Sequence, residues 1–297
     1  MDRVLPSEGR SRRFKSRREY FLFKMLKISS RDNPKIKQAR KVRDGLIDRL
    51  IFVEGLRLAE EISRSGLIIS DVFYTEDFAQ TERGRDFLQT AETSKLTKVS
   101  GKIFDSLADT VNSQGIIVIC EKPETNQNII ESNLAKSSKF PLLVLLHQIN
   151  NPANLGAILR TCEAVNVSGV IATNRSANAF SPKALRGAMG ASLRLPMWTN
   201  ADFYEVLSWA NANNFTSVCA DVSATKSYLE VDWRKPRLLV FGSEAHGLSA
   251  EEYEKVDESL LIPMENTVES LNLAVSAGVI LFEAKRQIDV EKTALKF

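Results

Sequence analysis

The chain has 297 residues, 43% hydrophobic and 26% charged, which is enough for two globular domains with buried cores. No apolar run approaches the roughly 18 residues of a membrane span, and the basic N-terminus lacks the apolar segment of a secretory signal. Three widely spaced cysteines and two histidines argue against a disulfide framework or a metal site. We therefore expect a cytoplasmic protein with no metal and with Cys120, Cys162 and Cys219 in the core.

Positive charge is concentrated at the N-terminus. Residues 1–43 carry fifteen Lys and Arg and four Asp and Glu, a net charge of +11, whereas the whole chain carries only +3. A basic arm on an acidic body indicates a polyanionic partner. For residues 1–27 the alternative is a solvated, disordered extension, and the acidic residues there count against a transit peptide. We predict that residues 1–27 form a basic, disordered extension.

The next part of the chain alternates helical and apolar patterns, which predicts a small α/β domain over residues 28–121. In chain order we expect a basic helix at 33–44, a strand at 49–55, a helix at 56–66 capped by Gly66, and strands at 67–75 and 115–120. The polar stretch 122–139 predicts a linker. The first helix offers a candidate phosphate-binding surface, or else a solvated face, made of Lys35, Lys37, Arg40, Lys41 and Arg43.

The rest of the chain, 140–297, alternates apolar strands with helices, which predicts a parallel sheet covered on both faces. The expected strands lie at 140–149, 168–173, 236–242 and 259–264. The expected helices lie at 155–165, 202–214 and 268–287. The last of these carries Ser, Ala and Gly along its apolar stretch, so another backbone can approach it closely.

Three segments follow buried strands of this sheet, at 150–160, 242–249 and 263–272. Ligands of open α/β sheets bind beyond the carboxyl ends of the strands, so these segments are the candidate site. Each is a weak signal alone. A helix-interior Arg is usually solvated, a Gly after a strand can be a simple turn, and Asn, Ser and Glu are common capping residues.

Together the three segments are much more specific. "NPANLGAILRT", "LLVFGSEAHGLS" and "LLIPMENTVESLNLAVSAGVILF" resemble, in order and spacing, the three motifs of the SpoU (TrmH-like) family of RNA ribose methyltransferases, over about residues 141–288. Residues 33–62 also resemble the accessory substrate-binding domain of that family, which has a ribosomal-protein-like α/β fold.

The resemblance implies a C-terminal methyltransferase domain with a knotted (trefoil) parallel sheet, a homodimer, and S-adenosyl-L-methionine as the cofactor. The implied reaction is methyl transfer to a ribose 2′-hydroxyl of structured RNA, without a metal. The separate N-terminal domain favours ribosomal RNA of the 23S type. The alternatives are a tRNA ribose methyltransferase and a non-catalytic RNA-binding assembly factor.

The resemblance also implies roles for individual residues. The catalytic set is Asn154, Arg160, Glu244, Ser270 and Asn272, and the cofactor set is Gly242, Ile262, Met264 and Leu271. A guanidinium rarely gives up its proton, so Arg160 is either a strongly perturbed base or a group that orients phosphate and stabilises negative charge. The chain departs from the family pattern at Asn151, usually Asp, and at Ala245, often Gly, which leaves the loop detail open.

Overall fold

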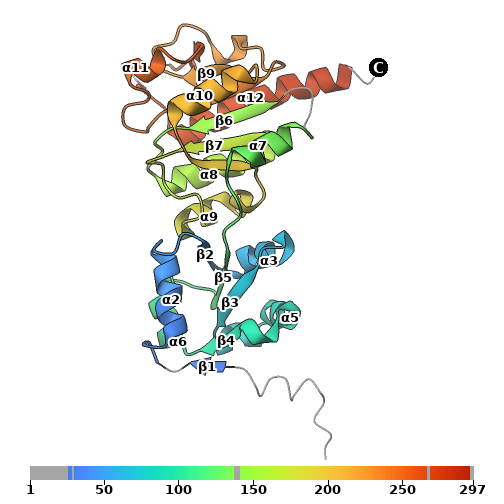
Figure 1. Ribbon diagram of the computed structural model, residues 1–297, viewed down its shortest axis with the longest axis vertical. Coiled ribbons are helices and arrows are strands. Elements are labelled where there is room, and N and C mark those ends of the chain that lie inside the picture. Colours follow the sequence, from blue (N-terminus) through green and yellow to red (C-terminus); the bar gives the residue numbers. More distant parts are fainter. Residues whose placement is uncertain (1–25, 29, 137–140, 266–267, 295–297) are drawn as a thin grey trace, which may run out of the picture.

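The computed structural model describes residues 26–28, 30–136, 141–265 and 268–294. Two sheets lie one beyond the other along the long axis of the molecule, and helices flank both (Figure 1). Most of the predicted extension, residues 1–25, lies outside the described residues. Its last two residues belong to β1, which starts at Leu26 and pairs with β4, so the folded part begins slightly earlier than predicted.

The N-terminal domain is built on a mixed sheet in the order β1-β4-β3-β5-β2. Its strands are β1 Leu26–Ile28, β2 Leu50–Glu54, β3 Ile69–Tyr74, β4 Leu96–Val99 and β5 Ile116–Glu121. Its helices are α2 Pro34–Arg43, α3 Leu56–Ser65, α4 Glu76–Gln80, α5 Glu82–Thr90 and α6 Gly101–Leu107. Apolar residues of α2 and α6 pack on one face of the sheet, and those of α3 and α5 pack on the other.

The predicted helix boundaries of this domain have clear local causes. The Asn33 side chain accepts a hydrogen bond from the backbone N–H of Lys35, and Pro34 occupies the first turn, so α2 starts where expected. Gly66 has φ 76° and ends α3 in the left-handed conformation that glycine adopts without strain. Both helices confirm the prediction.

The C-terminal domain contains a parallel sheet in the order β11-β9-β10-β6-β7-β8. Its strands are β6 Leu142–Leu146, β7 Gly169–Thr173, β8 Met197–Ala201, β9 Thr216–Ala220, β10 Arg237–Phe241 and β11 Glu258–Leu260. The chain moves outward from β6 to β8, crosses to β9, and then inserts β10 between β9 and β6. The carboxyl ends of these strands share one edge, and the strand order reverses between β6 and β10, which is where such sheets bind ligands.

Helices cover both faces of this parallel sheet, as predicted. They are α7 Gln127–Leu134, α8 Pro152–Val165, α9 Pro182–Ala188, α10 Phe203–Ala212, α11 Ala250–Tyr253 and α12 Leu273–Ala294. Apolar residues of α8 and α12 pack on one face, and those of α7 and α10 pack on the other. The three cysteines are buried, as expected, and burial raises the pKa of the Cys120 and Cys219 thiols to about 12. The fold class is therefore the predicted one, while the knot stays a prediction.

The sequence prediction gave no range for the strands β1, β4, β8 and β9, and two helices also differ from it. Helix α7 lies inside the stretch 122–139 predicted as a linker, because Asn126 caps its start and Ile130 is fully buried against the sheet. Helix α12 starts at Leu273 and not at residue 268. The Asn272 side chain accepts hydrogen bonds from the backbone N–H groups of Ala274 and Val275, which sets that start.

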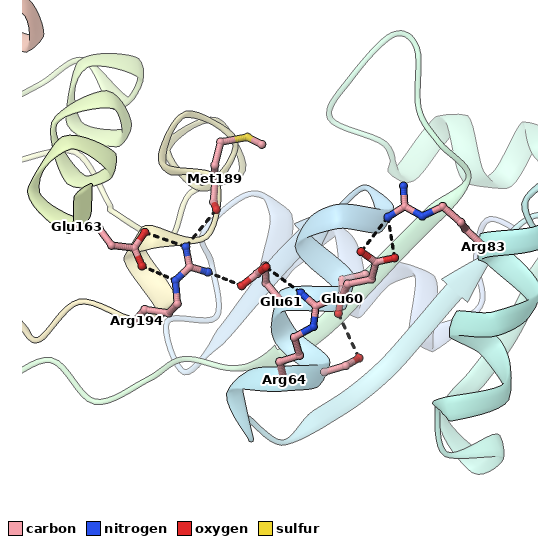
Figure 2. Close-up of polar contacts among 9 residues, drawn as sticks. Glu60, Glu61, Arg64, Arg83, Glu163, Met189 and Arg194 are labelled. Carbon is pink, nitrogen blue, oxygen red and sulfur yellow. Dashed lines mark hydrogen bonds and ion pairs between the residues drawn. The ribbon is translucent and has the colours of Figure 1, made fainter. Parts of the chain in front are cut away.

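Ion pairs join the two domains (Figure 2). Arg194 contacts both carboxylate oxygens of Glu163 on α8 and one oxygen of Glu61 on α3. A second pair joins Arg186 to Asp109, with an N–O distance of 2.6 Å. Helix α9 also packs against β2. Among the described residues, no helix is both long enough and apolar enough to span a membrane.

Candidate active site

The three segments singled out in the sequence meet at the carboxyl edge of the parallel sheet. The Glu244 carboxylate accepts hydrogen bonds from the backbone N–H groups of Asn150 at 3.0 Å and Asn151 at 3.1 Å. The Asn154 side chain donates to Glu244 at 3.4 Å and accepts from the Asn272 side chain at 3.2 Å. The carboxylate and two amides thus connect the loops after β6, β10 and β11, and we call them the Glu244–Asn154–Asn272 network.

Local sequence places each member of this network. Asn151 is the N-cap of α8 and Pro152 fills its first turn, so Asn154 projects from the start of that helix. Asn272 uses its carbonyl oxygen to cap α12 and its NH₂ group to reach Asn154. The Asn272 side chain therefore caps α12 and also takes part in the network. From sequence alone, capping and a role in the site were two alternative roles.

A tight turn in the second segment explains why position 242 is a glycine. Ser243 and Gly247 exchange backbone hydrogen bonds of 3.1 and 2.9 Å, which folds residues 243–247 back over the end of β10. A Cβ on Gly242 would lie 2.3 Å from a backbone carbon of Gly247, so only glycine fits there.

The third segment has the chemistry that the implied cofactor needs. Residues 262–265 and 268–271 form no backbone hydrogen bond with any described partner, so among the described residues nothing competes with a ligand for their C=O groups or, except at Pro263, their N–H groups. Ile262 and Met264 are half-buried, and Leu271 is 36% exposed. Adenine and ribose bind to apolar side chains and free backbone groups of this kind. S-adenosylmethionine therefore fits the residues present, while the assignment of these residues to it stays a prediction.

Arg160 and Ser270 are not part of the network. Both are exposed, and neither side chain makes a hydrogen bond or ion pair within the described ranges. Arg160 lies six residues after Asn154 on α8, which corresponds to about 9 Å along the helix and about 120° around it. The two side chains thus leave the helix in different directions.

A buried histidine holds the second segment in place, and the sequence reading assigned it no role. His147 follows β6 and is only 4% exposed. Its Nε2 lies 3.0 Å from Glu252 Oε1, and its Nδ1 lies 3.1 Å from Thr173 Oγ1. Glu252 also closes a capping box with Ser249 at the start of α11. The Ser-x-x-Glu pattern at 249–252 and a polar residue directly after a buried strand were the available signals.

The predicted RNA-binding residues on α2 are mostly occupied within their own domain. Lys35 pairs with Asp71 at 2.6 Å and Lys37 with Asp32 at 3.1 Å. Arg40 donates to Ser106, and Arg43 contacts Asp44 and the carbonyls of Ser106 and Leu107. Lys41 alone of the five is exposed and without a described partner. An RNA-binding role for this helix stays a prediction.

Comparison with known proteins identifies the family. Residues 141–282 match the SpoU rRNA Methylase family, and residues 33–118 match the MRM3-like substrate binding domain. The chain is 31% identical to the 23S rRNA (guanosine-2′-O-)-methyltransferase RlmB of Bordetella pertussis over 216 residues, which cover 72% of this chain and 88% of RlmB. The chain belongs to the SpoU rRNA methylase family.

Two further relatives align over most of the chain. An uncharacterized tRNA/rRNA methyltransferase of Synechocystis is 29% identical over 88% of this chain and 93% of its own length. The crystal structure of an AdoMet-bound rRNA methyltransferase from Sinorhizobium meliloti aligns with a TM-score of 0.76 at 25% identity, over 89% of this chain and 98% of that one. The predicted family and fold are confirmed. So is the enzyme class, an RNA methyltransferase that uses S-adenosylmethionine.

No three His, Cys, Asp or Glu side chains gather into a possible metal site anywhere in the described ranges. The expectation of metal-independent chemistry rests on the family resemblance and stays a prediction.

Proposed function

We propose that this SpoU family member methylates a ribose 2′-hydroxyl of ribosomal RNA, and that the Glu244–Asn154–Asn272 network holds its catalytic loops. The network carries the proposal, because it joins three distant segments at the sheet edge where ligands bind. The ribosomal substrate is supported by RlmB, which is named for 23S rRNA, and by the match of residues 33–118 to a substrate-binding domain.

The cofactor, when bound, supplies the methyl group and the leaving group. The protein's own task is to hold the hydroxyl in line behind the methyl carbon and to assist loss of its proton, and positioning of this kind contributes several kcal/mol. Glu244, Asn154 and Asn272 fix the loops, while Ile262, Met264 and Leu271 line the cofactor side together with the backbone at Gly242. Ser270 lies next to Leu271, where it can donate to substrate or cofactor.

Arg160 has a different role in this scheme. It is exposed, unpaired within the described ranges, and directed about 120° away from Asn154 around α8. A guanidinium in that state is suited to bind a phosphate of the RNA and to stabilise the negative charge that develops on the hydroxyl oxygen.

Substitution of Arg160 tests this division of labour. Arg160→Ala should abolish methyl transfer to a 23S rRNA fragment while leaving S-adenosylmethionine affinity within about twofold, because the side chain lies outside the network. The control is Lys136→Ala, which changes an exposed cation after α7, near the amino end of β7, and should retain full activity. A parallel loss of cofactor binding in Arg160→Ala would contradict the scheme.

The substrate class has its own test. A strain that lacks this protein should lose one 2′-O-methylation in ribosomal RNA and keep its tRNA methylations. Loss of a tRNA methylation would select the tRNA alternative. An unchanged methylation map, together with RNA binding by the purified protein, would select the assembly factor.

We also propose that the enzyme is a homodimer located in the cytoplasm. Along α12 an apolar stripe faces solvent, with Val275 52%, Phe282 54% and Val290 60% exposed. Gly278 lies on the same helix with open space around its α-carbon, so a second helix can approach closely. Phe282→Glu should convert a dimer into a monomer in light scattering, and a wild-type monomer would overturn this part of the proposal.

A further inference from the structure

A polar groove runs between the two domains. Its first part is a hollow of about 250 Å³ between residues 42–52 and the loop 178–182. Its second part is a hollow of about 360 Å³ between Lys122, the loop 172–180 and the end of β8. The two hollows adjoin, because four residues line both, and we call them together the interdomain groove: Asp48, Lys122, Asn178 and Phe180.

The second hollow lies beside the segment that leads into the candidate active site. Thr173, which lines the second hollow, accepts a hydrogen bond from the backbone N–H of Gln148 at 3.1 Å. The N–H of Ala177 donates to the carbonyl of Ile149 at 2.7 Å. The next residue, Asn150, donates to Glu244. The groove therefore lies between the substrate-binding domain and the loop 172–180, which is hydrogen-bonded to the segment that supports the Glu244–Asn154–Asn272 network.

Arg175 stands out among the charged residues of the groove. Arg43 is paired with Asp44, and Lys122 with Asp48, whereas Arg175 is exposed and has no described partner. Its φ of 63° is unusual for a residue with a side chain. The turn is held by backbone hydrogen bonds from Asn174 to Ala201 and from Ser176 to Thr173. Strained backbone of this kind is often kept where it directs a side chain toward a ligand.

We infer that this groove holds the stretch of RNA that flanks the target nucleotide, with Arg175 bound to a backbone phosphate. The inference rests on the proposed function. Guanidinium binds phosphate through paired hydrogen bonds, and Arg175 gives the otherwise neutral groove a net positive charge. Asn178 and Asn200 add polar side chains for ribose and bases. The position of the groove, between the substrate-binding domain and the catalytic edge, favours RNA over a small ligand.

Charge reversal tests the inference. Arg175→Glu should raise the Kd for a 23S rRNA fragment about tenfold. It should also reduce the slope of log K against log salt concentration by about one released counterion. The KM for RNA should rise in step, while kcat and S-adenosylmethionine affinity stay near wild type. The matched control is Lys136→Glu, near the opposite end of β7, which should change none of these values. Unchanged RNA affinity in Arg175→Glu with full methyl transfer would show that the groove does not bind the flanking RNA, and would leave the proposed function intact. Absence of methyl transfer in the wild type would overturn the proposed function itself.

Crosslinking gives an independent measurement. The native cysteines are buried, so a single surface cysteine can be labelled selectively. Asp48 lines both hollows and its side chain is 83% exposed. A photoreactive label on Asp48→Cys should crosslink to bound RNA, and the same label on Lys136→Cys should not. Equal crosslinking at the two sites, or none at Asp48→Cys, would contradict the inference.

Discussion

The Glu244–Asn154–Asn272 network and the ion pairs of Arg194 both connect segments far apart in the chain, but they differ in what remains available to a ligand. Arg194 uses Nε, Nη1 and Nη2 on Glu163, Glu61 and the Met189 carbonyl, so four of its five N–H donors are occupied (Figure 2). Beside the network, residues 262–265 and 268–271 keep backbone groups without described partners. A cluster whose donors are mostly occupied holds structure, whereas a cluster next to polar groups without described partners can accept a ligand.

Among substitutions in the two clusters, the largest expected effect comes from Asn154→Asp. The change keeps the shape of the side chain but places a second carboxylate against Glu244, where the amide now donates at 3.4 Å. Repulsion should separate the three loops and lower kcat/KM for RNA by about 100-fold. The midpoint of thermal unfolding should move little, because Glu244 and Asn272 are exposed and Asn154 is only half-buried. Near-normal activity would show that the network is a capping arrangement and no more.

A smaller effect is expected at the domain interface. Glu61→Gln removes the negative charge that faces both Arg194 and Arg64 but leaves the contact of Arg194 with Glu163, and should lower the free energy of unfolding by about 1 kcal/mol. Glu60→Gln is the matched control, because Glu60 has the same 24% side-chain exposure but pairs with Arg83 inside its own domain. Protease cleavage in the connection between the domains should increase only in Glu61→Gln. Identical stability and cleavage of the two variants would show that the Arg194–Glu61 contact does not hold the domains together.

The buried His147 predicts a pH dependence of stability. Burial lowers the pKa of His147 below its usual 6.5, against the opposing effect of Glu252. Below about pH 6.5 the His147 imidazole is therefore protonated more readily in the unfolded chain than in the folded protein. The free energy of unfolding consequently falls as the pH drops below about 6.5. His147→Gln should flatten this slope between pH 6.5 and 5 in denaturant titrations, and the exposed His246→Gln should not. An unchanged slope in His147→Gln would show that other groups cause it.

The smallest expected effect is a difference between two lysines of α2, one without a described partner and one in an ion pair. Lys41→Glu should weaken RNA binding about threefold, because Lys41 is exposed and unpaired within the described ranges. Lys35→Gln should instead reduce stability with little effect on RNA, because Lys35 is paired with Asp71. Titrations at several salt concentrations distinguish the two outcomes, and the reverse pattern would contradict them.

Sequence reasoning located seven of the eleven described strands and the three site segments, for identifiable reasons. Apolar runs predicted the central strands, and Gly66 and Asn33 predicted the ends of helices because capping is local chemistry. Helix α7 was missed because its stability depends on Ile130 packing against the sheet, which the sequence does not display. The same applies to charge. The sequence does not show that Lys35 pairs with Asp71, because the two residues are far apart in the chain. It also does not show that Arg175 has no described partner, because this depends on the turn after β7.

The insertion of β10 between β9 and β6 has a consequence for synthesis of the protein. As the chain leaves the ribosome, β6, β7 and β8 can assemble early, but one side of β6 stays without a neighbour until β10 emerges. An unpaired, apolar strand edge is prone to pair with other chains. Nascent chains stalled between Ala201 and Arg237 should therefore aggregate or recruit chaperones more than chains that have passed Phe241.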